Sequence, residues 1–336
     1  MSNLKKILLD KVSCKSIWFM RQAGRYLPEF QKIRSKNPDF IKLCLNSELS
    51  SEITLQPIKR FDIDSAIIFS DILIVPYALG QNVNFIKDHG PKLSDFNFKK
   101  FLNYKESNFS QNLSPVYKAI DLTRKKLKKN KSLISFVGGP WTLLVYMLGI
   151  KESKKELDLK KLKDKKEFLN QAIENLIRFL CIHIKNQVNA GADVVQVFDS
   201  WAGLIPSQNL NDYCFTPNAK IISYCKQRKI PNICFPKGIK ENFETFNKIV
   251  RPDGINLDSE IDPIWAKEKL RNVVIQGGLD PNILLKSDKE ITEGATKYIR
   301  TFKDIPYVFN LGHGLLPETD PDKVSKLIKF YRNYNG

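Results

Sequence analysis

Histidine is scarce in this chain, and its cysteines are not paired. The sequence holds only His89, His183 and His313, and none of its six cysteines belongs to a C-x-x-C pair. Protein zinc sites usually need clustered cysteine and histidine at short, regular spacings. A chain of 336 residues also has room for a core that needs no disulfide staples. We therefore expect no metal site and a reducing, cytoplasmic location.

Long apolar runs are also missing. The least polar stretch, residues 136–150, contains Gly138, Gly139 and Pro140 and is too short to span a bilayer. The basic N-terminal stretch MSNLKKILLDKVSCK loses its apolar character at Asp10, so we expect no secretory signal. These features predict no membrane partner.

Acidic residues are outnumbered, which leaves a formal net charge of +18. A basic balance can indicate nucleic acid, an anionic membrane or an acidic substrate. Here the excess is mostly lysine in runs such as 125–131 and 160–166, which fall on expected helix faces or ends. No nucleic-acid-binding motif accompanies them. We expect no nucleic-acid partner; tight, salt-sensitive oligonucleotide binding would favour that alternative.

Seven compact apolar runs are present, and most are separated by helical patterns. Unalternating runs of this kind are typical of strands buried on both faces. The runs cover residues 65–71, 133–137, 194–198, 230–235, 255–257, 273–275 and 307–311. The rhythm predicts an α/β fold with a single domain over residues 1–336, a (β/α)8 TIM barrel whose N-terminal extension contributes to the active-site cleft. The eighth strand is expected within residues 81–113, which are poorly patterned.

Helices are expected between these strands, most clearly over residues 168–188, followed by Gly191 as a C-cap. Helical spacing also covers residues 38–60, and the pairs Asp262-Pro263 and Asp320-Pro321 read as an N-cap followed by the first helical residue. A doubly wound open sheet is the competing fold. No G-x-G-x-x-G or P-loop follows an early strand to support it.

Polar and glycine-rich residues follow the expected strands, where ligands collect in parallel α/β folds. These ends are Asp71, Gly138-Gly139-Pro140 with Tyr146 beyond, Asp199-Ser200, Pro236-Lys237-Gly238, Asp258, residues 276–280, and Gly312-His313-Gly314. Each also has a plain structural interpretation: Asp71 as a helix cap, Ser200 as a turn residue, His313 bonded to backbone. A Ser200, His313 and Asp71 triad lacks the G-x-S-x-G context of a nucleophile elbow, which disfavours a hydrolase.

Residues 20–30, MRQAGRYLPEF, place Arg21 and Arg25 four positions apart around a glycine. Gly24 weakens a helix here, and Pro28 favours an extended residue before it. Two guanidiniums on such a short segment suit bidentate binding of carboxylates. The alternative is a surface turn with two solvated arginines.

Six motifs in order resemble the uroporphyrinogen decarboxylase family and span nearly the whole chain. They are MRQAGRYLPEF, AIIFSDILIVPYALG, GGPWTLLVYM, VVQVFDSWAG, QGGLDP and NLGHGLLPETDP. The resemblance implies a cytoplasmic, cofactor-free (β/α)8-barrel homodimer of haem and tetrapyrrole synthesis. Its substrate would be uroporphyrinogen III, whose four acetate side chains lose their carboxyl groups to give coproporphyrinogen III. Gly278 departs from the asparagine that many relatives carry there.

The resemblance also implies the site. By position, the catalytic residues would be Asp71, Arg21 and Tyr146, and the substrate-binding residues would be Arg21, Gln22, Ala23, Gly24, Arg25, Asp71, Tyr146, Ser200 and His313. The runner-up is a zinc-dependent methyltransferase acting on corrinoid-carried methyl groups, for which the cysteine and histidine positions offer no ligand set.

Overall fold

The main sheet of the molecule has seven strands, and all neighbouring pairs are parallel. The computed structural model describes residues 1–86, 90–150 and 166–334. In sheet order the strands are β1 (Ser65–Ile67), β4 (Ser132–Gly138), β5 (Val194–Asp199), β6 (Asn232–Pro236), β7 (Gly254–Leu257), β8 (Val274–Gly277) and β9 (Tyr307–Val308). Each strand overlaps one of the apolar runs, so the predicted parallel α/β architecture is confirmed. His89 and residues 160–165 of the second lysine run lie outside the described ranges.

The eighth position of the barrel is filled by the N-terminal segment around Ile17. Ile17 forms a parallel bridge with Phe309, directly after β9, and its carbonyl accepts a 2.9 Å hydrogen bond from the Asp64 amide, directly before β1. The expectation of an eighth strand within residues 81–113 is wrong. That region instead forms a separate antiparallel pair, β2 (Val83–Ile86) and β3 (Gly90–Leu93).

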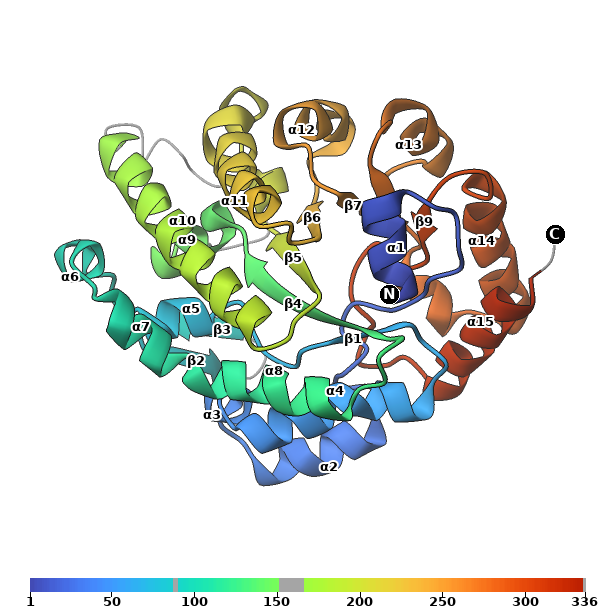
Figure 1. Ribbon diagram of the computed structural model, residues 1–336, viewed down its shortest axis with the longest axis horizontal. Helices are drawn as coiled ribbons and strands as arrows, with labels where there is room; N and C mark the ends of the chain where they lie inside the picture. Colours follow the sequence, from blue (N-terminus) through green and yellow to red (C-terminus); the bar gives the residue numbers. More distant parts are fainter. Residues whose placement is uncertain (87–89, 151–165, 335–336) are drawn as a thin grey trace.

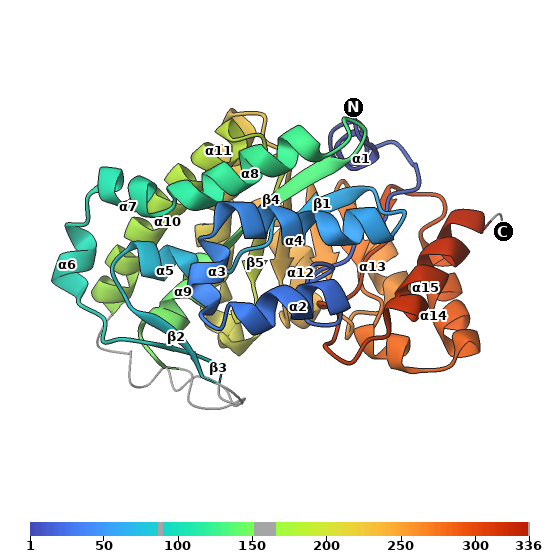
Figure 2. The same ribbon diagram turned by 90° about the horizontal axis from the view of Figure 1, so that it is seen from below.

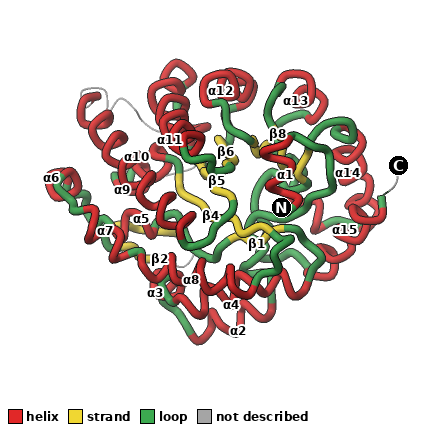
Figure 3. Tube along the Cα trace, in the orientation of Figure 1, coloured by secondary structure: helices red, strands yellow, loops and turns green. Residues whose placement is uncertain are grey.

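Helices surround the strands (Figures 1 and 3). They are α1 (Asn3–Asp10), α2 (Pro28–Lys36), α3 (Phe40–Cys44), α4 (Ser47–Arg60), α5 (Ile74–Ala78), α6 (Phe98–Leu102), α7 (Glu106–Asn112), α8 (Ser114–Lys126), α9 (Pro140–Met147), α10 (Lys166–Asn189), α11 (Thr216–Gln227), α12 (Phe243–Val250), α13 (Pro263–Lys269), α14 (Asp288–Thr301) and α15 (Pro321–Asn333). Short 3-10 segments cover Ala202–Leu204, Ser207–Asn209, Lys240–Asn242 and Pro281–Leu285, and a π-helical turn covers Asn211–Phe215. Viewed from below, α4 lies between α2 and α8 (Figure 2). No helix within the described residues has the length and apolar character that crossing a membrane requires.

Helix boundaries follow the capping signals. The Asp262 carboxylate accepts from the amides of Ile264 and Trp265, and the Asp320 carboxylate accepts from the Asp322 amide at the start of α15. Proline takes the first helical position in both helices. The long pattern over residues 38–60 is divided into α3 and α4. Asn46 divides it because its side chain accepts from the Leu49 amide and starts a new helix.

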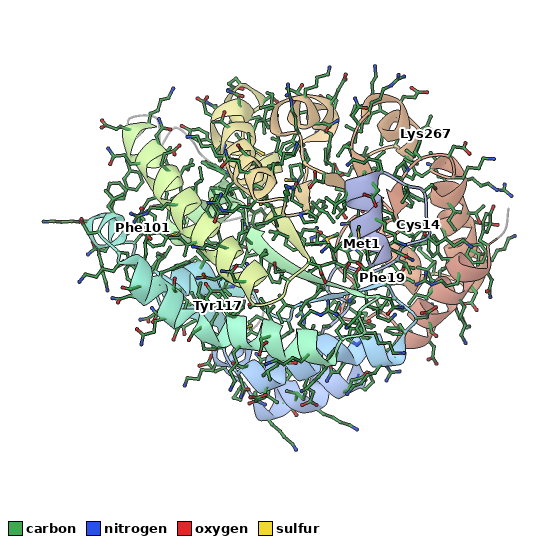
Figure 4. The ribbon with its side chains drawn as sticks, in the orientation of Figure 1. Met1, Cys14, Phe19, Phe101, Tyr117 and Lys267 are labelled. Atoms are coloured by element: carbon green, nitrogen blue, oxygen red, sulfur yellow. The ribbon has the colours of Figure 1, made fainter. Side chains whose placement is uncertain are left out.

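Helix α1 closes the end of the barrel where the strands begin. Leu8 packs against Gly254 at the start of β7, and Lys5 lies 3.4 Å from Asp193, directly before β5. Figure 1 shows α1 inside the ring of helices, and Figure 4 labels Phe19 inside the same ring and Phe101 towards its edge. The loops that carry the polar residues therefore lie at the opposite end of the barrel, where the strands have their carboxyl ends.

A layer of buried amides fixes the N-terminal segment inside the barrel. The Trp18 indole donates to Gln276 Oε1 (3.0 Å), and Gln276 Nε2 donates to Gln196 Oε1 (3.2 Å) and Asn256 Oδ1 (2.8 Å). These bonds join residue 18 to β8, β5 and β7. Since such groups are costly to leave unpaired when buried, the network sets where residues 19–25 emerge.

Candidate active site

The arginine segment leaves the barrel through a tightly built turn. Arg21 has a left-handed backbone (φ +61°), and a Cβ on Gly24 would lie only 2.9 Å from the Arg21 carbonyl oxygen. The buried Gln22 amide accepts from the Phe19 N–H (3.0 Å) and donates to the Ser65 carbonyl of β1 (2.9 Å). Gln22 therefore anchors the turn to the sheet through its side chain, while Ala23 is half-buried against the core.

Arg21 reaches across to the loop that follows β9. A side chain on Gly314 would overlap Arg21 Cγ and Cδ, so the arginine stem lies directly on that glycine. Arg21 is solvent-accessible. Even so, desolvation, followed by the charge of Arg25, lowers its pKa below the usual value. The Arg21 stem therefore packs against the loop, and the residue remains accessible to solvent.

Asp71 lies beyond the carboxyl end of β1 and is electrostatically coupled to Arg21. Its Oδ1 accepts from the Leu73 amide at 2.8 Å, which is the local capping role that its position allows. Burial raises the pKa of Asp71 to about 6, and the Leu73 N–H and the Arg21 charge oppose the rise. The carboxyl is still partly open to solvent. Asp71 is thus an anion held in a poorly solvated place beside a cation.

Tyr146 joins the same group from α9, which starts at Pro140 directly after β4. Burial raises the pKa of the Tyr146 hydroxyl; a hydrogen bond with Trp201 lowers it, and the charges of Asp71 and Arg21 act on it in opposite senses. The Tyr146 and Trp201 rings meet edge to face with centroids 5.9 Å apart. Arg21, Asp71 and Tyr146 are therefore three electrostatically coupled groups from three parts of the chain.

His313 is held as a neutral hydrogen-bond donor. Its Nδ1 accepts from the Gly314 amide (2.6 Å), which leaves the proton of the neutral ring on Nε2. Burial, followed by the charges of Lys237 and Arg21, lowers the pKa of His313 to about 3. The ring also contacts Phe235 of β6, with centroids 6.4 Å apart. Near neutral pH, His313 can therefore donate a hydrogen bond from Nε2–H to a ligand oxygen.

Ser200 directly follows β5 in a half-buried turn, beside a buried hydrogen-bond cluster. The Asp199 carboxylate accepts from Thr142 Oγ1 (2.6 Å) and Asn218 Nδ2 (2.9 Å), and a Cβ on Gly139 would lie 2.5 Å from Asp199 Cγ. This cluster fastens the end of β5 to the start of α9. Ser200 and Tyr146 are thereby fixed relative to each other.

Nothing in these contacts assembles a serine-histidine-aspartate triad. His313 Nδ1 is occupied by a backbone amide, as is one Asp71 oxygen. A triad needs the histidine bonded to the carboxylate through one ring nitrogen and to the serine through the other.

Lys237 is the site residue to which the sequence assigns no role. It follows β6 and is half-buried; desolvation lowers its pKa, the charge of Asp258 raises it, and the charge of Arg21 lowers it further. The signal in the sequence is its place in Pro236-Lys237-Gly238 at a strand end. Because lysine is frequent in this chain, a lysine at this position does not by itself indicate a functional role.

Arg25 is exposed on the same turn as Arg21 and accepts from Gln31 Nε2 through its backbone carbonyl (2.8 Å). In the part of the chain that the structure describes, no carboxylate lies within ion-pairing distance of the Arg21, Arg25 or Lys237 side chains. Lys237 is half-buried, as is Arg124, but Arg124 pairs with Asp193 at 2.8 Å. Unpaired cations at this end of the barrel suit a ligand rich in carboxylates. Within residues 1–86, 90–150 and 166–334, no cluster of three histidine, cysteine or acidic side chains could hold a metal ion.

Comparison with known proteins identifies the family of the chain. A family model described as uroporphyrinogen decarboxylase matches residues 4–334. Uroporphyrinogen decarboxylase from Orientia tsutsugamushi (strain Ikeda) is 43% identical over 332 residues, which cover 95% of this chain and 94% of the relative. The Novosphingobium aromaticivorans uroporphyrinogen decarboxylase is 37% identical over 336 residues, covering 99% and 98%.

Among solved structures, a methyltransferase from Methanosarcina mazei superposes with a TM-score of 0.80 at 17% identity, covering 99% of this chain and 98% of the other. This likeness concerns the barrel fold alone. Sequence identity and the family model reach further and confirm the resemblance seen in the six motifs: this chain belongs to the uroporphyrinogen decarboxylase family.

Proposed function

We propose that this chain removes the carboxyl groups of the four acetate side chains of uroporphyrinogen III, giving coproporphyrinogen III and carbon dioxide in tetrapyrrole biosynthesis. The family supports this reaction. The observation that carries it is the coupling of the Arg21 cation with the Asp71 carboxylate, Tyr146 and the His313 loop at one end of the barrel. The Asp71 carboxylate beside cations that have no ion pair in the described part of the chain matches a ligand with pyrrole N–H donors at its centre and carboxylates at its edge.

The substrate can serve as its own electron sink. Protonation of a pyrrole carbon next to an acetate arm makes the ring cationic, and this cation accepts the electrons released with carbon dioxide. The reaction is thus proposed to need no cofactor. The protein must hold the macrocycle, stabilise a transient positive charge and allow a proton to be delivered.

In this proposal Asp71 has the central catalytic role. An ionised carboxylate accepts several N–H bonds and stabilises the positive charge that develops in the ring. With a pKa of about 6, Asp71 is mostly ionised near neutral pH, and its poor solvation strengthens its interaction with that charge.

Arg21 and Arg25 bind acetate and propionate carboxylates, each charge-assisted bond contributing about 1.5–3 kcal/mol. Tyr146, Ser200 and His313 orient further arms. Gln22, Ala23 and Gly24 act through the backbone turn they build, since the Gln22 amide is already bonded to backbone on both sides.

Two proton donors fit the proposal: Arg21, and a substrate carboxyl acting through water. The lowered pKa of Arg21, caused first by desolvation, moves that residue toward acidity. An arginine nevertheless remains a weak acid in proteins.

An anaerobic assay with uroporphyrinogen tests the proposal, with products separated by the number of carboxyl groups they retain. We expect intermediates of successively lower carboxyl number, ending at coproporphyrinogen, without added metal or cofactor. Recovery of unchanged uroporphyrinogen by folded protein would refute the proposed activity, and stoichiometric zinc retained through purification would favour the methyltransferase alternative.

A further inference from the structure

We propose that Lys237 is a third cationic anchor of the active site, which binds one carboxylate at the edge of the tetrapyrrole. This inference rests on the proposed function and adds a residue that neither the sequence motifs nor the family comparison singled out.

The backbone around Lys237 is fixed by β5 and by the segment that follows β5. The Lys237 amide lies 3.2 Å from the Asp199 carbonyl of β5, and the Lys237 carbonyl accepts from the Gly203 amide at 2.9 Å. Gly203 and Gly238 touch through their backbones, since a Cβ on Gly203 would lie 2.6 Å from the Gly238 oxygen. Gly238 has a left-handed backbone (φ +81°), which glycine adopts without strain. Lys237 is therefore fixed at the strand end next to Ser200.

The charge of Lys237 acts on groups already assigned to the site. It is among the causes that lower the pKa of His313, and the Arg21 charge is among those that lower the pKa of Lys237, after desolvation. The His313 ring contacts Phe235, two residues before Lys237, with centroids 6.4 Å apart, and the Arg21 stem lies on Gly314, directly after His313. Arg21, His313 and Lys237 thus come from three separate segments that meet at the carboxyl end of the barrel.

The charges of Asp258 and Glu260 raise the pKa of Lys237, but neither carboxylate forms an ion pair with it. Asp258 uses Oδ2 to accept from the Gly238 amide (2.7 Å) and Oδ1 to accept from the Glu260 amide (3.1 Å). Throughout the described residues, Lys237 has no ion pair and no side-chain hydrogen bond. A half-buried ammonium without a counter-ion is unfavourable unless a ligand supplies one. A carboxylate arm of the substrate has the right chemistry.

The test compares Lys237→Met, which keeps the length of the stem and removes the charge, with Lys237→Arg, which keeps the charge. Lys185→Met is the matched control, because Lys185 is an exposed lysine of α10 and its loss changes the net charge equally. The KM for uroporphyrinogen and the inhibition constant of coproporphyrinogen are measured anaerobically, with melting temperatures to confirm folding. Lys237→Gln replaces the methionine variant if that one does not fold.

We expect Lys237→Met to raise the KM for uroporphyrinogen about tenfold, equivalent to about 1.4 kcal/mol. Lys237→Arg should restore most of the affinity, and Lys185→Met should match the wild type. An equal rise in the coproporphyrinogen inhibition constant would place Lys237 on a propionate arm, which the product retains. A rise confined to uroporphyrinogen would place it on an acetate arm.

The proposed role of Lys237 as an anchor would be overturned by any of three results. These are an unchanged KM and inhibition constant in Lys237→Met, a fall in its kcat without a change in KM, and an equal effect of Lys185→Met. These results are separable from failure of the proposed function, since in that case the wild type itself would leave uroporphyrinogen unchanged.

Discussion

At the scale of single residues, Asp71 serves two purposes that conflict energetically. One oxygen holds the backbone of Leu73, whereas burial of the ionised group is unfavourable and raises its pKa to about 6. Charged groups kept in poorly solvated places are common in active sites, where function outweighs stability.

The first prediction concerns the stability of Asp71→Asn. Because the folded-state pKa lies above the ordinary 3.8, Asp71 contributes stability in its protonated form below about pH 4, and that contribution is lost as pH rises through about 6. Asparagine stays neutral and retains an acceptor for Leu73. The variant should match the wild type near pH 4 and be more stable by roughly 1–3 kcal/mol at pH 7.5, allowing for partial solvent access.

Denaturant unfolding at several pH values measures this difference. If the stability advantage of Asp71→Asn over the wild type shrinks as pH rises, the raised pKa of Asp71 is contradicted. A variant less stable than the wild type at pH 7.5 would do the same.

A second prediction concerns His313, whose imidazole should stay neutral throughout the working pH range. Its pKa, lowered by burial first and then by Lys237 and Arg21, is about 3. Nitrogen NMR should show an Nε2–H tautomer that does not titrate above about pH 5. His313→Asn should lower kcat/KM by roughly tenfold, since it removes one hydrogen bond and no charge. Titration near pH 6.5, or complete inactivation, would reassign His313 to proton transfer.

At the scale of elements, the N-terminal segment does two jobs within ten residues. Ile17 completes the barrel between β9 and β1, and Arg21 then enters the site. This strand position was not predictable from the sequence, because its apolar run is short, forms a single bridge and leads directly into the arginine turn. The longer runs at β1, β4 and β5 were predictable because both of their faces are buried.

The third prediction tests how this segment is held. Asp64 Oδ2 accepts from the Ile17 amide (2.7 Å) and from Arg332 of α15 (2.8 Å), and its side chain is 14% exposed. Asp64→Ala should lower the free energy of unfolding by about 2–3 kcal/mol, because it leaves a buried amide unpaired.

Asp62→Ala is the matched control, since Asp62 also pairs with Arg332 (3.3 Å) but is 75% exposed. It should change the free energy of unfolding by less than about 1 kcal/mol. Urea unfolding measures both free energies of unfolding. Equal effects of the two substitutions would show that Asp64 does not secure the barrel closure.

At the scale of the whole molecule, the sequence predicted the parallel barrel and the position of the candidate site residues after its strands. Asp71, Tyr146, Ser200 and His313 all follow strands, and a parallel sheet places such ends on one face. Lys237 was not distinguishable among the 54 lysines and arginines, because only the fold shows that it is half-buried and has no ion pair among the described residues. The division of residues 38–60 was missed because Asn46 interrupts a pattern that otherwise keeps helical spacing.

Family membership leads us to propose a cytoplasmic homodimer. The fourth prediction is that analytical ultracentrifugation gives a species of twice the 38.7 kDa chain mass. A monomer at micromolar concentration would refute the dimer and leave the site assignments untouched. Oligonucleotides should bind weakly, because the lysine runs of the sequence lack a nucleic-acid-binding motif.

The central claim is that the Asp71 carboxylate faces the pyrrole nitrogens while cationic side chains hold the acidic arms. The most direct measurement is anaerobic turnover of uroporphyrinogen by Asp71→Asn, alongside its affinity for coproporphyrinogen. We predict a kcat at least about 100-fold below the wild type, the size expected when preorganised charge stabilisation is removed, with the fold intact and product still bound. Near-normal turnover by the folded variant would contradict the account.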